Sequence, residues 1–212
     1  MPDTNSKTGL TFTDDTTITP IWEKAMEIYI SEHFQSKQPK VLDVGTHEGQ
    51  RIIWLMDAIF RNPYCFINDN WDVRSHIGRE TRDRCIENAR IYLDEHPGYI
   101  EMVEGPSLQV LAELAQRQCF SFDFIYNDAL KKQSKLVLFE LVMMWKLLGP
   151  NGILLVSGYA SSPQVKTAVD AFISCFSDEM YAHEPVCTRD YSEDDCDHYF
   201  FVKRRLSALE RI

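Results

Sequence analysis

The stretch VLDVGTHEGQRIIWL, residues 41–55, decides the fold of this chain. It begins with an apolar run typical of a buried strand, passes through a turn that contains Gly45 and Gly49, and continues with apolar residues at helical spacing. Glycines in such a turn let the backbone approach a ligand closely, and the start of the following helix offers unpaired N–H groups. A strand, a glycine turn and a helix in this order indicate a nucleotide-binding site.

An acidic residue, Asp43, ends the apolar run two residues before Gly45. A carboxylate would repel a pyrophosphate and attract an ammonium group. The turn also reads GxxxG rather than the GxGxxG of dinucleotide sites, which disfavours an NAD-linked enzyme. The stretch therefore favours a ligand with a positive group. The alternative is that Asp43 only caps backbone groups of the turn.

Short apolar strands alternate with helices along the rest of the chain. The predicted strands cover residues 40–44, 64–68, 99–103, 122–126 and 153–156, the predicted helices cover residues 50–60, 80–95, 108–118, 133–148 and 163–176, and a final pair of strands covers residues 179–187 and 198–203. Successive strand–helix units predict right-handed crossovers and parallel pairing. We predict an α/β fold: a doubly wound, Rossmann-like, mostly parallel seven-stranded sheet with an antiparallel C-terminal hairpin strand.

The length of 212 residues fits one sizeable domain. Residues 1–19 are polar and predict a flexible N-terminal segment, and residues 20–212 predict a single domain. A helix is expected to begin at Pro20, and its Trp22, Tyr29 and Phe34 would suit a homodimer contact.

Charge and cysteine content narrow the function classes. The net charge is 22 − 32 = −10, whereas a nucleic-acid-binding domain normally carries a basic face. The six cysteines form no CxxC pair, which favours reduced thiols and a cytoplasmic protein. We expect no signal peptide, and no apolar run approaches the roughly 20 residues that span a bilayer.

Polar side chains follow the predicted strands, where ligands bind in doubly wound sheets. Asp69 follows the second strand and is suited to accept hydrogen bonds from a ribose, although the neighbouring Asn68, Asn70 and Asp72 are also acceptors. Trp71 could stack on a base or cover the end of the sheet.

The third and fourth strands are also followed by polar residues. Ser107 is either a helix N-cap or a neighbour of an adenine ring. Asp128 follows Asn127 at the end of the fourth strand, where it could orient a substrate, act as a base, contribute to a metal site or cap a helix.

Taken together, these loops resemble those of class I S-adenosylmethionine-dependent methyltransferases, and most closely the small O-methyltransferase-like group. VLDVGTHEGQRIIWL is similar to the first motif of that group, (E/D)-(I/V)-G-T-x-x-G. VEGPSLQVLAEL, FDFIYNDALKK and WKLLGPNGILLVSGY resemble its later segments. The resemblance covers about residues 38–160, and the C-terminal hairpin fits the same fold.

The resemblance implies S-adenosyl-L-methionine as the cofactor. It places Asp43, Gly45, Thr46 and Gly49 at the methionine end, Asp69 at the ribose and Ser107 near the adenine. It also assigns four further residues to cofactor binding: Glu48, Asn70, Trp71 and Asn127. Asp43 would then lie near the cationic ammonium and sulfonium groups.

The resemblance also bears on metal use. Metal-dependent members join an acid at the position of Asp128 with an acidic pair after the fifth strand, where this chain has Ser157 and Gly158. We therefore expect no catalytic metal. The predicted function is methyl transfer to a small molecule, with O-methylation favoured and Asp128 as the catalytic residue; His47 and His76 are other candidate proton acceptors. The alternative is a catalytically inactive binding or scaffold protein that keeps the fold.

Overall fold

A seven-stranded sheet forms the centre of the computed structural model, which describes residues 9–13, 38–58, 63–117, 121–129, 132–186 and 197–204. The strand order is β3-β2-β1-β4-β5-β7-β6. The strands are β1 Lys40–Val44, β2 Tyr64–Asp69, β3 Tyr99–Glu104, β4 Phe122–Asn127, β5 Leu148–Ser157, β6 Met180–Val186 and β7 His198–Lys203. The first five pair in parallel, and β7 lies antiparallel between β5 and β6. The predicted fold class is confirmed.

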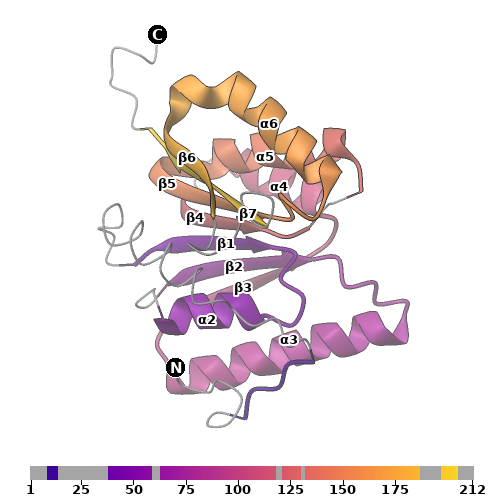
Figure 1. The fold of residues 1–212 in the computed structure, drawn as a ribbon. Coiled ribbons are helices and arrows are strands. Elements are labelled where there is room, and N and C mark those ends of the chain that lie inside the picture. The colour runs from indigo at the N-terminus through magenta and orange to yellow at the C-terminus, as the bar shows by residue number, and fades with distance from the viewer. Residues whose placement is uncertain are drawn as a thin grey trace.

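Helices cover both faces of the sheet in a three-layer arrangement (Figure 1). They are α2 Gln50–Ala58, α3 His76–Glu95, α4 Ser107–Gln116, α5 Ser134–Leu147 and α6 Pro163–Phe176, with a short 3-10 helix at Ser177–Glu179. α4, α5 and α6 lie on one face, and α2 and α3 lie on the other. None of the helices within the described ranges is both long and apolar enough to cross a bilayer.

The alternation of side chains along β1 divides the core into two clusters. Leu42 and Val44 join the cluster under α4, α5 and α6, whereas Val41 joins the cluster under α2 and α3. All three are almost fully buried, because a parallel sheet is covered on both faces. Asp43, between Leu42 and Val44, therefore shares the face of Val41.

The structure corrects two predicted boundaries. α3 begins at His76, four residues before the predicted start, because the Ser75 hydroxyl caps it by accepting the Gly78 N–H. β5 begins at Leu148 rather than at residue 153, since Leu148 pairs with Phe122 before the chain shifts register. The other predicted elements that fall on described residues are confirmed to within two residues at each end.

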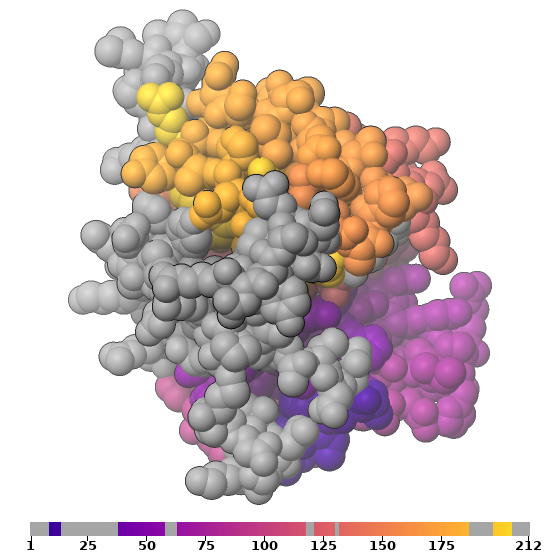
Figure 2. All heavy atoms as spheres, in the orientation of Figure 1, coloured from indigo at the N-terminus to yellow at the C-terminus, as the bar shows by residue number. Residues whose placement is uncertain are grey.

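A short N-terminal segment, residues 9–13, packs against α3. The side chain of Asn88 donates to Thr11 O at 2.9 Å and accepts from Thr11 N at 3.0 Å, and Leu10 is buried in the α2/α3 cluster. The atoms of this segment lie on the surface of the lower half of the molecule in Figure 2. The helix predicted from Pro20, with Trp22, Tyr29 and Phe34, lies outside the described residues.

Candidate functional site

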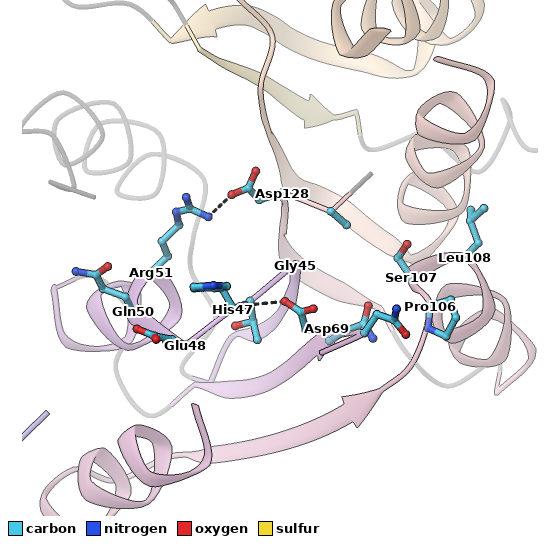
Figure 3. Close-up of a pocket in the computed structure, with 14 residues that line it drawn as sticks. Gly45, His47, Glu48, Gln50, Arg51, Asp69, Pro106, Ser107, Leu108 and Asp128 are labelled. Atoms are coloured by element: carbon cyan, nitrogen blue, oxygen red, sulfur yellow. Dashed lines mark hydrogen bonds and ion pairs between the residues drawn. The ribbon is translucent and has the colours of Figure 1, made fainter. Parts of the chain in front are cut away.

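A cavity of about 460 Å³ opens at the carboxyl ends of β1, β2 and β4 (Figure 3). β1 lies between β2 and β4, so this is where the strand order reverses, the usual ligand position in doubly wound sheets. Its size falls within the range of small-molecule pockets. The lining residues are Gly45, Thr46, His47, Glu48, Gln50, Arg51, Asn68, Asp69, Asn70, Pro106, Ser107, Leu108, Asp128 and Ala129.

The glycine turn is closely packed against the end of β4. Gly45 has φ +86°, and a Cβ there would lie 2.7 Å from the carbonyl carbon and oxygen of Asp128. The backbone N–H of Gly45 donates to Asn68 O at 2.8 Å, and that of Asp128 donates to Val44 O at 2.8 Å. Gly45 is therefore required by the packing of the ends of β1, β2 and β4.

Asp43 lies beneath the turn and does not line the cavity. Its side chain is 2% exposed, and the Thr46 hydroxyl donates to its Oδ2 at 2.5 Å. Among the described residues, no hydrogen-bond partner meets its Oδ1. Burial raises the pKa of Asp43 from about 3.8 to about 7. The sequence predicted Asp43 near the cationic groups of a ligand. In the structure its side chain lies under the turn and not in the wall of the cavity.

Asp69 lies in the wall of the cavity. Its carboxylate accepts the backbone N–H of His47 at 2.8 Å and that of Trp71 at 3.1 Å. These bonds fix the carboxylate between the glycine turn and the loop after β2, beside Asn70. A carboxylate has room for further hydrogen bonds beyond two.

Trp71 does not line the cavity. The indole is 4% exposed and belongs to the α2/α3 core cluster, and its Nε1–H donates to His47 O at 2.8 Å. Of the two sequence interpretations, covering the end of the sheet is the one that this structure shows. The position of Trp71 in a loop could not reveal in which direction the ring points.

Glu48 reaches the cavity wall, but its carboxylate binds other parts of the chain. It accepts Thr13 N at 2.7 Å and the Thr13 hydroxyl at 2.6 Å, and it pairs with Arg84 at 2.7 Å. Burial acts to raise the pKa of Glu48, but the bonds from Thr13 and the charge of Arg84 outweigh it and lower the pKa. Glu48 thus ties the glycine turn to the N-terminal segment and α3.

Ser107 is not the N-cap of α4. Pro106 occupies the cap position, and the Ser107 hydroxyl, in the first turn, donates to the fully buried carboxylate of Glu140. Asn127 Nδ2 also approaches Glu140, at 3.5 Å. Ser107 lines the cavity, whereas Asn127 lies behind it. Glu140 was missed by the sequence reasoning, although a single acid within the apolar stretch of residues 136–145 is a usable signal.

Asp128 faces the cavity and forms an ion pair with Arg51, from the first turn of α2. The two side chains are 11% and 28% exposed, and the Arg51 guanidinium lies 5.5 Å from the centre of the Tyr126 ring. Figure 3 shows the pair across from Pro106, Ser107 and Leu108. The sequence analysis did not single out Arg51, although it directly follows the glycine turn.

Two other predicted positions lie away from the cavity. Gly49 has φ +82° and packs against Cys85, where a Cβ would lie 3.3 Å from Sγ. His76 is exposed at the start of α3, where it faces Glu80 at 3.4 Å. His47, in contrast, lines the cavity.

The end of β5 carries no acidic pair. Ser157 is the last residue of the strand, and Gly158 N donates to Asp197 O at 2.7 Å. Among the residues with described positions, no three His, Cys, Asp or Glu side chains gather in a group suited to hold a metal ion.

The strand order and the cavity at its reversal point define a Rossmann-like protein with a cavity where doubly wound sheets bind their ligands. A family model described as a methyltransferase domain matches residues 42–158, more than half of the chain. The chain belongs to this methyltransferase family. The resemblance found in the sequence is therefore confirmed.

Solved structures share the fold at low sequence identity. An O-methyltransferase from Bacillus cereus, in complex with S-adenosylhomocysteine, has a TM-score of 0.58 and 15% identity, covering 92% of this chain and 84% of its own. TomG from Streptomyces achromogenes, in complex with S-adenosylmethionine, has a TM-score of 0.60 and 16% identity over 90% and 82%. Human methyltransferase-like protein 13, in complex with S-adenosylhomocysteine, has a TM-score of 0.58 and 12% identity over 91% and 88%. No curated protein matches the chain significantly.

Proposed function

We infer that the protein is an S-adenosylmethionine-dependent methyltransferase that methylates an oxygen of a small molecule without a catalytic metal. The observation that carries this proposal is that the glycine turn, Asp69 and Ser107 line the same cavity. Family membership supports methyl transfer, and similar structures with the same fold hold S-adenosylmethionine or its demethylated product. When bound, the cofactor would supply an electrophilic methyl group on a sulfonium.

The residues present fit such a cofactor. The turn at Gly45 and Thr46 leaves room for the methionine part, and Asp69 retains acceptor capacity for ribose hydroxyls. Ser107, Pro106 and Leu108 form the opposite end, which we assign to the adenine. Gly49, Trp71 and Asn127 act indirectly by supporting the turn and the strand ends.

The acceptor is proposed to lie near Asp128. Its carboxylate is fixed by Arg51 at the cavity wall, where it could orient an acceptor hydroxyl and take its proton. Two features support independence from a metal: Asp128 is paired with a guanidinium, and β5 ends at Ser157, followed by Gly158, instead of being followed by an acidic pair. Mg²⁺ and Ca²⁺ need several oxygen ligands.

A catalytically inactive binding protein is the second candidate. The ion pair between Asp128 and Arg51 favours it, since a carboxylate engaged by a guanidinium is a weaker proton acceptor. The small-molecule acceptor, the cytoplasmic location and the homodimer remain predictions. The negative net charge supports an acceptor other than nucleic acid.

Calorimetric titration with S-adenosylhomocysteine tests cofactor binding, and transfer of a radiolabelled methyl group to a panel of phenols and sugars tests turnover. We expect binding by the wild type and a loss of about tenfold or more in Asp69→Ala, because a hydrogen-bonded charged group contributes about 1.5–3 kcal/mol. Absence of binding would refute the proposal. Binding without transfer to any acceptor would favour the second candidate, and loss of transfer upon chelation would refute independence from a metal.

A further inference from the structure

The glycine turn has an unfavourable backbone conformation. Gly45, His47 and Gly49 have φ angles of +86°, +55° and +82°. His47 carries a Cβ, and the left-handed region is disfavoured for such a residue. A disfavoured backbone conformation persists only where the surrounding structure holds it in place. The shape of the turn therefore depends on groups outside residues 45–49.

One set of these groups comes from the loop after β2. The Asp69 carboxylate accepts the His47 N–H at 2.8 Å, and the Trp71 indole donates to His47 O at 2.8 Å. Both backbone polar groups of His47 are thus held from the side of the sheet.

The next residue, Glu48, is held from α3 and from the N-terminal segment, residues 9–13. Asn88 Nδ2 donates to Glu48 O at 3.2 Å, and Arg84 pairs with the Glu48 carboxylate at 2.7 Å. The backbone N–H and the hydroxyl of Thr13 donate to the two oxygens of that carboxylate, at 2.7 Å and 2.6 Å. Glu48 is only 2% exposed, so these groups replace water as its partners.

The N-terminal segment is firmly attached to the rest of the molecule. Leu10 is buried in the α2/α3 core cluster, and Phe12 packs against it. Asn88, which is fully buried, accepts Thr11 N at 3.0 Å and donates to Thr11 O at 2.9 Å. Because the Asn88 side chain also donates to Glu48 O, it joins the segment to the turn. Thr13 provides a second link.

We propose that the N-terminal segment positions the glycine turn for ligand binding, through Thr13 and Asn88, and that a bound ligand in turn stabilises the segment. Neither residue lines the cavity, whereas Glu48 does. Thr13 and Asn88 are therefore positioning residues, which act on the ligand through the turn. The second half of the proposal follows from the first, since coupling between two sites is reciprocal. The inference rests on the proposed function for its choice of ligand, S-adenosylhomocysteine.

Hydrogen exchange measures the coupling directly. The amides of Thr11 and Thr13 donate to Asn88 and Glu48, so their exchange rates report on attachment of the segment. S-adenosylhomocysteine should slow the exchange of both amides by about fivefold or more, at the lower end of the usual range of coupling between sites.

Thr13→Val tests the hydroxyl link to the turn. It should weaken S-adenosylhomocysteine by about fivefold, as measured by calorimetry, and speed the exchange of the amides of residues 45–49 without ligand. Thr13→Ser keeps the hydroxyl and should restore both values.

Thr167→Val is the matched control. It also removes a threonine hydroxyl, which donates to Pro163 O at 2.8 Å on the exposed face of α6. It should change neither the affinity nor the exchange of the turn. Urea denaturation of each variant gives its global stability separately.

Two results would overturn the inference. The first is a Thr13→Val variant of lower global stability that keeps wild-type affinity and wild-type exchange in the turn, because the segment would then be only structural. The second is a wild type in which bound S-adenosylhomocysteine leaves the Thr11 and Thr13 amides unchanged. If the wild type does not bind S-adenosylhomocysteine, the proposed function fails. Exchange of residues 45–49 in Thr13→Val then still decides whether the segment positions the turn.

Discussion

The ends of β1 and β4 each present an aspartate, and the two residues serve different purposes. Asp43 is buried under the turn, hydrogen bonded to Thr46, and has a pKa raised to about 7 by burial. Asp128 reaches the cavity and pairs with Arg51. The acid within the sequence motif therefore belongs to the structure of the turn, whereas the acid at the neighbouring strand end lies in the wall of the cavity.

The two strand ends meet at Gly45, so a side chain there should have the largest effect. Gly45→Val would combine a strained φ with an overlap against the Asp128 carbonyl. We expect a loss of about 2–5 kcal/mol in the free energy of unfolding and no measurable binding of S-adenosylhomocysteine. Urea denaturation and calorimetry measure the two effects.

Gly9→Val separates the strain from the overlap. Gly9 also has a positive φ, +74°, but a Cβ there meets nothing within 4 Å. It should cost less stability than Gly45→Val and leave binding unchanged. Equal costs in the two variants would contradict the close packing of β1 against β4.

Stability as a function of pH should distinguish the two aspartates. Because folding raises the pKa of Asp43, the folded protein binds more protons than the unfolded chain between about pH 4 and pH 7. The contribution of Asp43 to stability is therefore present at low pH and is lost as the pH rises to about 7, by up to about 4 kcal/mol.

Asp43→Asn removes this dependence. The stability of the wild type relative to Asp43→Asn should fall from pH 4 to pH 7, as measured by urea denaturation at each pH. Asp94→Asn, at an exposed acid on α3, is the control and should show no such trend. A wild type that gains stability relative to Asp43→Asn over this range would show that Asp43 is charged in the folded protein.

Glu48 anchors the glycine turn to the N-terminal segment and α3, so removing its side chain should have an intermediate effect on stability. Glu48→Ala leaves Arg84 and the backbone N–H of Thr13 without their partner and should cost about 2–3 kcal/mol. Thermal denaturation at pH 7 measures this. Glu87→Ala removes an exposed ion pair on α3, the helix that carries Arg84, and should have no measurable effect on stability. Equal losses of stability in the two variants would argue that Glu48 does not anchor the turn.

The smallest effect is expected at Trp71. Trp71→Phe removes the hydrogen bond to His47 O and should cost about 1 kcal/mol of stability. Since the ring does not line the cavity, affinity for S-adenosylhomocysteine should stay within about threefold. A tenfold or larger loss of affinity would instead place Trp71 in contact with the ligand.

The fold could be predicted from two sequence patterns. Strands that are covered on both faces consist of continuous apolar residues, such as residues 153–156, and helices have apolar residues at helical spacing. The start of α3 was harder to predict, since the Ser75 cap lies within a polar, charged stretch. The positions of Gly45, Asp69, Ser107 and Asp128 at strand ends also followed from topology.

What the sequence could not give is the direction and partner of each side chain. Nothing in the motif distinguishes an Asp43 below the turn from one above it. The pairing of Arg51 with Asp128, and of Glu48 with Thr13, joins residues 77 and 35 positions apart, so it depends on tertiary structure. Burial of Trp71 likewise depends on how the loop folds back onto the turn.

A crystal structure of the protein with S-adenosylhomocysteine tests the central claim most directly. We expect the adenine beside Ser107 and Leu108, the ribose hydroxyls on Asp69, and the methionine part beside the turn at Gly45, with Asp43 still beneath the turn. A ligand bound in the reverse orientation, or outside the cavity at the ends of β1, β2 and β4, would contradict the account.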